Sequence, residues 1–294
     1  MFSRTAQVKI PPIDFHAQPI HARAREYLPQ NLPDLSPSQC RVRYTISQIR
    51  AGFPEDTYWL KVDEEKRFPS EFFSAITRDS WLGICMPREY GGRELGLQEA
   101  VTMMSTIAES GAGGTGASSI HMNIFGLAPV VKGKRERVLS SQSRIQVQSR
   151  AVRDGDTYVL SGSKIWTSTA QVAEKILILV RTTPVDQARK PTHGLSLFYT
   201  DLDRAQAQVM EIPKMDRAAV DSNSLFFEDW RVSTTDLIGS EGDGFKQILY
   251  GMNAERILIA GEAVGLGFAA LRRTANYAAE SKHDIGRNKG ISTR

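Results

Sequence analysis

The segment 147–170, VQSRAVRDGDTYVLSGSKIWTSTA, constrains the fold of this chain more than any other stretch. It contains two strand-like patterns that are separated by Asp154-Gly155-Asp156. An Asp-Gly pair between alternating runs is the strongest short-range signal for a β-hairpin. The segment ends in an aromatic and hydroxyl cluster, Trp166-Thr167-Ser168-Thr169. We therefore expect a hairpin whose second strand ends in this cluster.

The composition is typical of a soluble globular protein. Of 294 residues, 41% are hydrophobic and 24% are charged, and the formal net charge is +4. The charges are interspersed and the longest basic stretch is Lys132–Arg137, which argues against nucleic-acid binding. The two cysteines, Cys40 and Cys85, do not make a disulfide framework. No apolar run approaches the ~20 residues that a membrane span needs.

Four regions follow one another along the chain. Residues 1–37 are interrupted by prolines and lack periodicity, which predicts a disordered extension. Residues 38–144, opened by the helix-start signal Ser36-Pro37, contain apolar residues at helical spacing and predict an N-terminal helical domain. Residues 145–240 contain short strand patterns between turn residues, which favours a middle antiparallel β-barrel or sandwich. Residues 241–294 begin a C-terminal helical domain, so the predicted fold class is α+β with several domains.

A long helix is expected from about Phe245 to Ser281. Apolar residues recur along one predicted face of this helix, at Phe245, Ile248, Leu249, Met252, Ile259, Ala263 and Leu266. Glu255 falls on the same face by spacing, and Arg256 lies beside it. A carboxylate and a guanidinium within an apolar stripe are unfavourable unless they are paired or used.

Six motifs stand out along the chain: MPREYGG at 86–92, RDGDTYVLSG at 153–162, KIWTS at 164–168, DWRV at 229–232, GSEGDGF at 239–245 and AER at 254–256. In their order and near spacing they resemble the motifs of acyl-CoA dehydrogenases, and the resemblance covers roughly residues 45–282. The resemblance implies an N-terminal helical domain, a middle β domain and a C-terminal four-helix domain, with FAD between the last two. It also implies an oxidoreductase that dehydrogenates an acyl-CoA thioester between its α and β carbons, in fatty-acid or secondary metabolism.

This chemistry needs a carboxylate in a water-poor pocket to remove the α-proton, and a flavin against the acyl chain to take the β-hydride. By resemblance, Trp166, Thr167 and Ser168 belong to the segment that covers the flavin ring, with Ser168 in place of the usual threonine. Without the resemblance, Trp166 would be interpreted as a core tryptophan at the end of a strand.

Glu255 occupies, by the same resemblance, the helix position of the catalytic base in the isovaleryl- and long-chain-like branches of the family. Most other branches supply the base from a helix further toward the C-terminus. Asn253 and Arg256 match positions that line the acyl-CoA site. The alternative for Glu255 is a buried ion pair with a neighbouring basic residue, and the sequence leaves both interpretations open.

The resemblance also implies partners and a location. The substrate is an acyl-CoA, and an electron-transfer flavoprotein or oxygen reoxidises the flavin. Intact relatives are homo-oligomers. The expected location is the mitochondrion or the peroxisome, with the cytoplasm as a third option.

The chain departs from the family pattern in two regions. The family carries a Thr-Glu-Pro…Ala-Gly-Ser-Asp signature that binds the flavin pyrimidine and the CoA side, and residues 132–146 do not contain it. After Ala279, the Phe-Gly pair and the Gln-containing helix of the family do not follow before Arg294. These departures predict a truncated and internally deleted member with an incomplete C-terminal helical bundle. They keep open a second function, that of a non-catalytic paralogue or assembly partner with impaired FAD binding.

Overall fold

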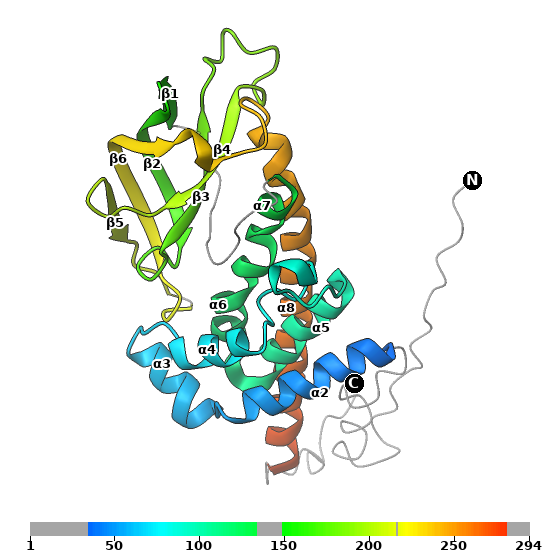
Figure 1. The fold of residues 1–294 in the computed structure, drawn as a ribbon. Helices are drawn as coiled ribbons and strands as arrows, with labels where there is room; N and C mark the ends of the chain where they lie inside the picture. Colours follow the sequence, from blue (N-terminus) through cyan, green and yellow to red (C-terminus); the bar gives the residue numbers. More distant parts are fainter. Residues whose placement is uncertain (1–34, 134–148, 216, 281–294) are drawn as a thin grey trace, which may run out of the picture. The chain divides into compact units, whose positions relative to one another are not determined.

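The computed structural model describes residues 35–133, 149–215 and 217–280 (Figure 1). They fall into two compact units, one of Leu35–Gly267 and one that contains the end of the last helix from Phe268. The predicted extension lies outside the described residues up to position 34, and so does the predicted boundary between residues 144 and 145. The other two predicted domain boundaries stay predictions.

Helices make up the first part of the chain. They are α2 (Pro37–Ala51), the π-helix Glu55–Trp59, α3 (Leu60–Glu64), α4 (Ser70–Arg78), the 3₁₀ turn Arg88–Tyr90, α5 (Leu97–Ile107), the π-helix Ala108–Ala112, α6 (Gly113–Gly126) and α7 (Ala128–Gly133). A capping box starts α2, because the Ser36 side chain accepts from the Gln39 amide at 3.2 Å while Gln39 Oε1 accepts from the Ser36 amide at 2.8 Å. The predicted helix start at Ser36-Pro37 is therefore confirmed.

These helices share one hydrophobic core. Many of its fully buried members come from α2, α4, α5 and α6, and these include Ile46, Phe72, Ile76, Met103, Ile107 and Ile120. Between α5 and α6 the backbone adopts positive φ at Gly111 (+93°) and Gly113 (+56°), which glycine tolerates without steric cost. This break lets α6 pack back against α5 instead of continuing the same helix.

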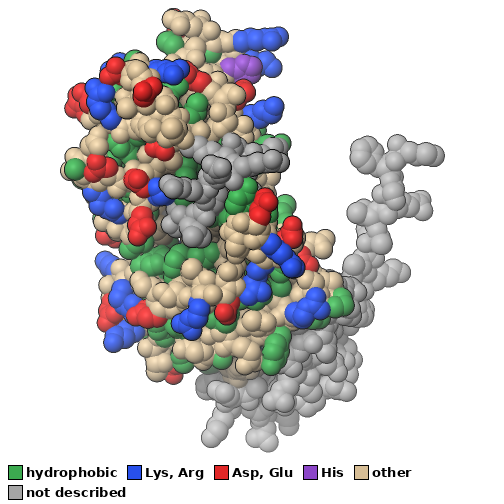
Figure 2. Space-filling view, viewed as in Figure 1, with side chains coloured by type: hydrophobic (Ala, Val, Ile, Leu, Met, Phe, Trp, Pro, Cys, Tyr) green, Lys and Arg blue, Asp and Glu red, His purple; other side chains and the backbone are tan. Residues whose placement is uncertain are grey.

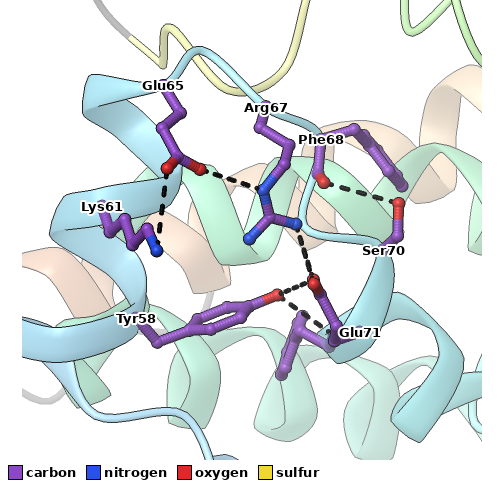
Figure 3. Close-up of polar contacts among 8 residues, drawn as sticks. Tyr58, Lys61, Glu65, Arg67, Phe68, Ser70 and Glu71 are labelled. Carbon is purple, nitrogen blue, oxygen red and sulfur yellow. Dashed lines mark hydrogen bonds and ion pairs between the residues drawn. The ribbon is translucent and has the colours of Figure 1, made fainter.

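A polar network fixes the connection between α3 and α4 (Figure 3). Arg67 Nη1 donates to both Glu71 carboxylate oxygens, at 3.0 and 2.8 Å, and Arg67 Nε donates to Glu65 at 3.3 Å. The Tyr58 hydroxyl donates to Glu71 at 2.9 Å and accepts from the Phe72 amide at 3.3 Å. The bond from Arg67 is the main reason that the pKa of Glu71 falls to about 2. The network therefore orients α4 from its first turn.

The middle part is a seven-stranded sheet with the order β5-β6-β2-β1-β3-β4-β7. The strands are β1 (Arg150–Asp154), β2 (Thr157–Ser168), β3 (Lys175–Arg181), β4 (Leu195–Asp201), β5 (Ala207–Glu211), β6 (Ser222–Ser233) and β7 (Leu237–Ile238). Asp154 pairs with Thr157, and Gly155 has a φ of +59°. The hairpin predicted from Asp154-Gly155-Asp156 is confirmed.

The α+β fold class is confirmed, but the sheet differs from the predicted antiparallel barrel or sandwich in two respects. It is mixed, because β3 pairs in parallel with β1, where the Arg181 amide donates to Ser149 O at 2.9 Å. Only residues 169–174 connect β2 to β3, so β3 starts near the end of the sheet where β2 ends and runs in the direction of β1. Within the described residues the sheet is also not closed, since β5 and β7 end the strand order.

Both faces of the sheet are packed. Alternate β3 side chains enter two clusters, Ile176, Ile178 and Val180 on one face and Leu177 and Leu179 on the other. The second cluster includes Leu127, Val130 and Ile248 from the helices. Ile248 belongs to α8 (Gly244–Glu280), the long helix that the sequence predicts. Helices thus cover the face of the sheet that contains Leu177 and Leu179.

One face of the molecule shows how the charged side chains of the described residues are distributed (Figure 2). On the face drawn in Figure 2, basic and acidic side chains are interspersed, as the sequence predicts. Among the described residues, no helix combines the length and the apolar character that crossing a membrane requires.

Candidate functional site

The end of β2 contains a β-bulge that exposes Trp166. Lys164 pairs with Leu225 and Thr167 pairs with Asn223, so Ile165 and Trp166 together face one residue of β6. Trp166 has a φ of +63°, and the bulge leaves Ile165 and Trp166 exposed by 40% and 46%. In a regular strand these neighbours would point to opposite faces. The structure therefore does not support a buried core tryptophan at this position.

The residues around the exposed indole are held firmly. Thr167 is buried, and its carbonyl accepts a hydrogen bond of 2.9 Å from Nδ2 of the fully buried Asn223. Asn223 Oδ1 accepts in turn from Gln171 Nε2 at 2.8 Å. Ser168 is partly exposed and pairs with Ser222 at the start of β6. The bulge thus places an exposed aromatic ring and a reachable hydroxyl on a well-anchored backbone.

Lys164 is a buried titratable group of this segment to which the sequence assigned no role. Its side chain is 3% exposed, and Nζ donates to Leu179 O at 2.6 Å across the sheet. Burial lowers the pKa of Lys164 from 10.5 to about 7. The KIWTS motif contained the residue, but only the bulge shows that Lys164 points inward together with Thr167.

Lys164→Met should reveal this burial through pH. Between about pH 7 and 10.5 the unfolded state keeps a proton on Lys164 that the folded state releases, so wild-type stability should rise with pH relative to the variant. The expected slope approaches 1.4 kcal/mol per pH unit within that window, and there is no further change below it. Urea unfolding of both proteins at several pH values measures the difference. A difference independent of pH would contradict a buried, neutralised Lys164.

The three predicted residues of α8 lie within one turn. Asn253 and Arg256 are exposed and are three residues apart, so they share a side of the helix. Glu255 is partly buried, next to Ala254, which packs against the helical core. The predicted site residues therefore form two groups, one at the end of β2 and one on α8. Their catalytic and binding roles stay predictions.

The packing of α8 differs from the predicted apolar face. Ile248 is buried, but Ile259 and Leu266 are exposed by 41% and 39%. Glycines occupy the buried side of α8 instead. A Cβ atom added at Gly251 would lie 2.8 Å from Phe125 O, and one added at Gly265 would lie 2.3 Å from Ser105 O. The helix thus approaches α5 and α6 backbone to backbone, which a stripe of large residues would prevent. The apolar periodicity was therefore a poor guide to the buried side.

Sequence reasoning also missed a polar cluster, which consists of the buried Ser118, His121 and Glu262 and the exposed Arg217. Arg217 Nη1 donates to Ser118 Oγ at 2.6 Å and lies 3.8 Å from Glu262 Oε1. His121 Nδ1 lies 3.9 Å from Glu262 Oε2, and the His121 ring stacks on Phe125. In the sequence, Glu262 within an otherwise apolar and glycine-rich stretch of α8 was the available signal.

Solved structures share this arrangement of helices, sheet and long helix. Butyryl-CoA dehydrogenase from Megasphaera elsdenii superposes with a TM-score of 0.73 at 20% identity, over 87% of this chain and 72% of that chain. An FAD complex of PigA superposes with a TM-score of 0.73 at 19% identity, over 85% of this chain and 70% of that chain. The fold is thus that of the acyl-CoA dehydrogenases.

Sequence comparison assigns the family as well as the fold. The family models for the acyl-CoA dehydrogenase N-terminal and middle domains match residues 54–136 and 137–230. The chain belongs to the acyl-CoA dehydrogenase family. Acyl-CoA dehydrogenase FadE26 from Mycobacterium tuberculosis is 27% identical over 246 residues, which cover 76% of this chain and 59% of that protein. Mitochondrial isovaleryl-CoA dehydrogenase from Pongo abelii is 25% identical, over 92% of this chain and 69% of that protein.

The chain spans about 60% of the length of several curated relatives. A 3-(aryl)acrylate reductase from Clostridium sporogenes is 24% identical over 76% of this chain and 64% of its own length. For cyclohex-1-ene-1-carbonyl-CoA dehydrogenase from Geobacter metallireducens, the identity is 25%, over 72% of this chain and 60% of that protein. The relatives therefore act on different substrates within one family.

Proposed function

We propose that this protein is an FAD-dependent acyl-CoA dehydrogenase. The observation that carries the proposal is the bulge at the end of β2, which exposes the Trp166 indole beside the partly exposed Ser168. A planar aromatic ligand with a polar edge needs an apolar surface and a nearby hydrogen-bonding group. The residues present fit the isoalloxazine ring of FAD in this sense. Family membership supports the same cofactor.

The bound flavin would supply the hydride acceptor for the β-carbon of the substrate. In our proposal Glu255 takes the α-proton of the acyl thioester. Glu255 is partly buried on α8, next to Ala254 of the helical core, so its carboxylate lies at the edge of that core. The exposed guanidinium of Arg256 and the amide of Asn253 would contact the CoA part, and Arg256 is suited to phosphate groups.

The proposal extends to the partners of the reaction. The electrons would pass from the flavin to an electron-transfer flavoprotein or to oxygen, and the protein would work as a homo-oligomer in the mitochondrion or the peroxisome. Membership of the family supports the acyl-CoA substrate and the electron acceptor, whereas the oligomer and the location follow only from the resemblance in the sequence. The acyl group of the substrate is left open, since the curated relatives include dehydrogenases named for isovaleryl, long-chain and short-chain acyl groups.

A titration of the purified chain with FAD tests the proposed cofactor site. We expect saturable binding with one FAD per chain, and Trp166→Ala should weaken it by about tenfold or more because the stacking surface is removed. Tyr44→Ala is the matched control, since Tyr44 is an exposed aromatic residue of α2. Failure of the wild-type chain to bind FAD would contradict the proposal, as would equal losses in the two variants.

A second candidate function is a non-catalytic partner that assembles with another chain. It is favoured by exposed apolar side chains on α8, at Ile257, Ile259, Val264 and Leu266. Exposed apolar side chains can mark an interface, and helical spacing puts Ile257 and Val264 on one side of α8 and Ile259 and Leu266 on another. Co-purification with a longer family member, together with an absence of FAD binding by the chain itself, would favour this function over catalysis.

A further inference from the structure

Arg217 lies in the connection between β5 and β6 and makes its polar contacts with the helices. Its φ is +53°, a conformation that is unfavourable for a residue with a Cβ atom. Nη1 donates to Ser118 Oγ of α6 at 2.6 Å and lies 3.8 Å from Glu262 Oε1 of α8. The contacts on two helices offset the local cost of this backbone conformation. Arg217 therefore ties the sheet to α6 and α8.

The acceptor side of this contact is deeply buried. Glu262 is 4% exposed, and its second carboxylate oxygen lies 3.9 Å from His121 Nδ1. The backbone of α6 comes close enough that a Cβ atom at Gly114 would lie 3.4 Å from Arg217 Cδ and 3.5 Å from Glu262 Oε1. A buried carboxylate is unfavourable without a cationic neighbour, so Arg217 is the expected counter-charge from the sheet.

The connection between β5 and β6 also makes hydrogen bonds to the residues that follow the exposed Trp166. Asp221, four residues after Arg217, accepts from the Thr169 amide at 3.0 Å through its carbonyl and from the Gln171 amide at 3.2 Å through Oδ2. Asn223 then holds Thr167. A short chain segment thus links the bulge of β2 to the Arg217–Glu262 contact.

The residue of α8 that Arg217 contacts, Glu262, lies on the same helix as the proposed base, Glu255. Glu262 follows Glu255 by seven residues, which is two turns or about 10 Å along the same side of α8. Arg217 therefore connects the two groups of candidate site residues, which otherwise lie on separate elements. A change at this contact should alter the position of one group relative to the other.

We propose that Arg217 is a positioning residue that fixes the flavin-facing bulge of β2 relative to α8, the helix of Glu255. Its effect on the reaction rests on the proposed function, whereas the mechanical link depends only on the described contacts. Nothing in the link requires Arg217 to touch substrate or flavin. Its role is to hold the geometry in which these ligands bind.

Arg217→Gly is the most direct variant, because glycine keeps the positive φ and removes only the side chain. We expect backbone amides of residues 166–171 and 217–223 to exchange with deuterium about tenfold faster or more, since a hydrogen bond to a charged group is lost. Asp229→Gly is the matched control, because Asp229 is exposed and also has a positive φ, +52°. Hydrogen–deuterium exchange followed by mass spectrometry measures both.

The location of the faster exchange distinguishes a positioning role of Arg217 from a general stabilising role. Uniformly faster exchange, including β3, would reduce Arg217 to a stabilising residue and overturn the proposal, as would unchanged exchange at residues 166–171. Arg217→Gly/Glu262→Gln also removes the buried carboxylate charge that loses its Arg217 contact, so it should recover global stability while residues 166–171 stay fast. Recovery of slow exchange there would contradict the link.

FAD affinity provides an independent measurement. Arg217→Gly should weaken FAD binding by about tenfold or more, while Asp229→Gly should not. Fast local exchange with unchanged FAD affinity would overturn the claim that the link positions the flavin site. If the wild-type chain binds no FAD, the proposed function fails, and the exchange experiment still decides whether the mechanical link exists.

Discussion

Gly265→Ala is expected to lower the free energy of unfolding by about 2 kcal/mol or more. An added methyl group would lie 2.3 Å from Ser105 O and 2.9 Å from Ala108 Cβ, so α8 would have to move away from α5. Alanine favours a helix over glycine by up to about 1 kcal/mol, which reduces the loss only in part. Urea unfolding followed by circular dichroism measures the change.

Gly267 offers a matched control two residues further along α8. A Cβ atom there would have no neighbour within 4 Å. Gly267→Ala should therefore raise the free energy of unfolding by about 0.5–1 kcal/mol through helix propensity alone. Equal effects at the two positions would contradict the close approach of α8 to α5, and with it the glycine-based packing of the helix.

Glu255→Gln should lower the rate of substrate dehydrogenation by about 100-fold to 10,000-fold, the range expected for loss of a general base. The amide has nearly the same shape as the carboxylate but does not take the α-proton. Turnover with a series of acyl-CoA substrates and an artificial electron acceptor measures the rate. The FAD affinity and the unfolding midpoint should stay close to wild type, which separates loss of chemistry from loss of structure.

Retention of most activity in Glu255→Gln would place the base elsewhere and would contradict the role of α8 in catalysis. A clear loss of stability in Glu255→Gln, without any wild-type turnover, would instead favour the interpretation of Glu255 as a buried ion-pair partner, because the neighbouring basic residue would lose its counter-charge. The two interpretations that the sequence leaves open therefore differ in a measurable way.

Arg256→Gln tests the proposed contact with the CoA part of the substrate. If Arg256 makes this contact, the variant should raise KM more than it lowers kcat.

Local signals in the sequence were sufficient for much of the fold. The Asp-Gly turn defines the β1–β2 hairpin, and Ser36-Pro37 defines the start of α2, because each depends on residues within a few positions. The sequence also predicts the extent of the long helix α8. The family motifs suggest residue roles that no local pattern supplies.

Features that depend on distant contacts were not predictable in this way. The parallel pairing of β3 with β1 depends on which side of the hairpin the chain returns to. The buried side of α8 is set by glycines that meet α5 and α6, whereas hydrophobic periodicity favours large side chains. Arg217 and Ser118 are 99 residues apart, so their hydrogen bond leaves no pattern in the sequence.

The β-bulge at the candidate site is a further feature that local sequence patterns do not predict. The sequence placed Trp166, Thr167 and Ser168 together, but alternation predicts that Trp166 and Lys164 share a face. Pairing with β6 instead turns Trp166 outward and keeps Lys164 and Thr167 inside. The exposed ring that supports the proposed flavin site is therefore a property of the sheet, which the motif alone does not contain.

The most direct test of the proposed function is reduction of bound flavin by substrate. The FAD-loaded wild-type chain is mixed with an acyl-CoA without oxygen, and the visible absorbance of the flavin is followed. We predict that the absorbance bleaches with at least one acyl-CoA, that an enoyl-CoA forms in equal amount, and that Glu255→Gln prevents both. A loaded flavin that stays oxidised with every acyl-CoA tested would contradict the assignment of this protein as an acyl-CoA dehydrogenase.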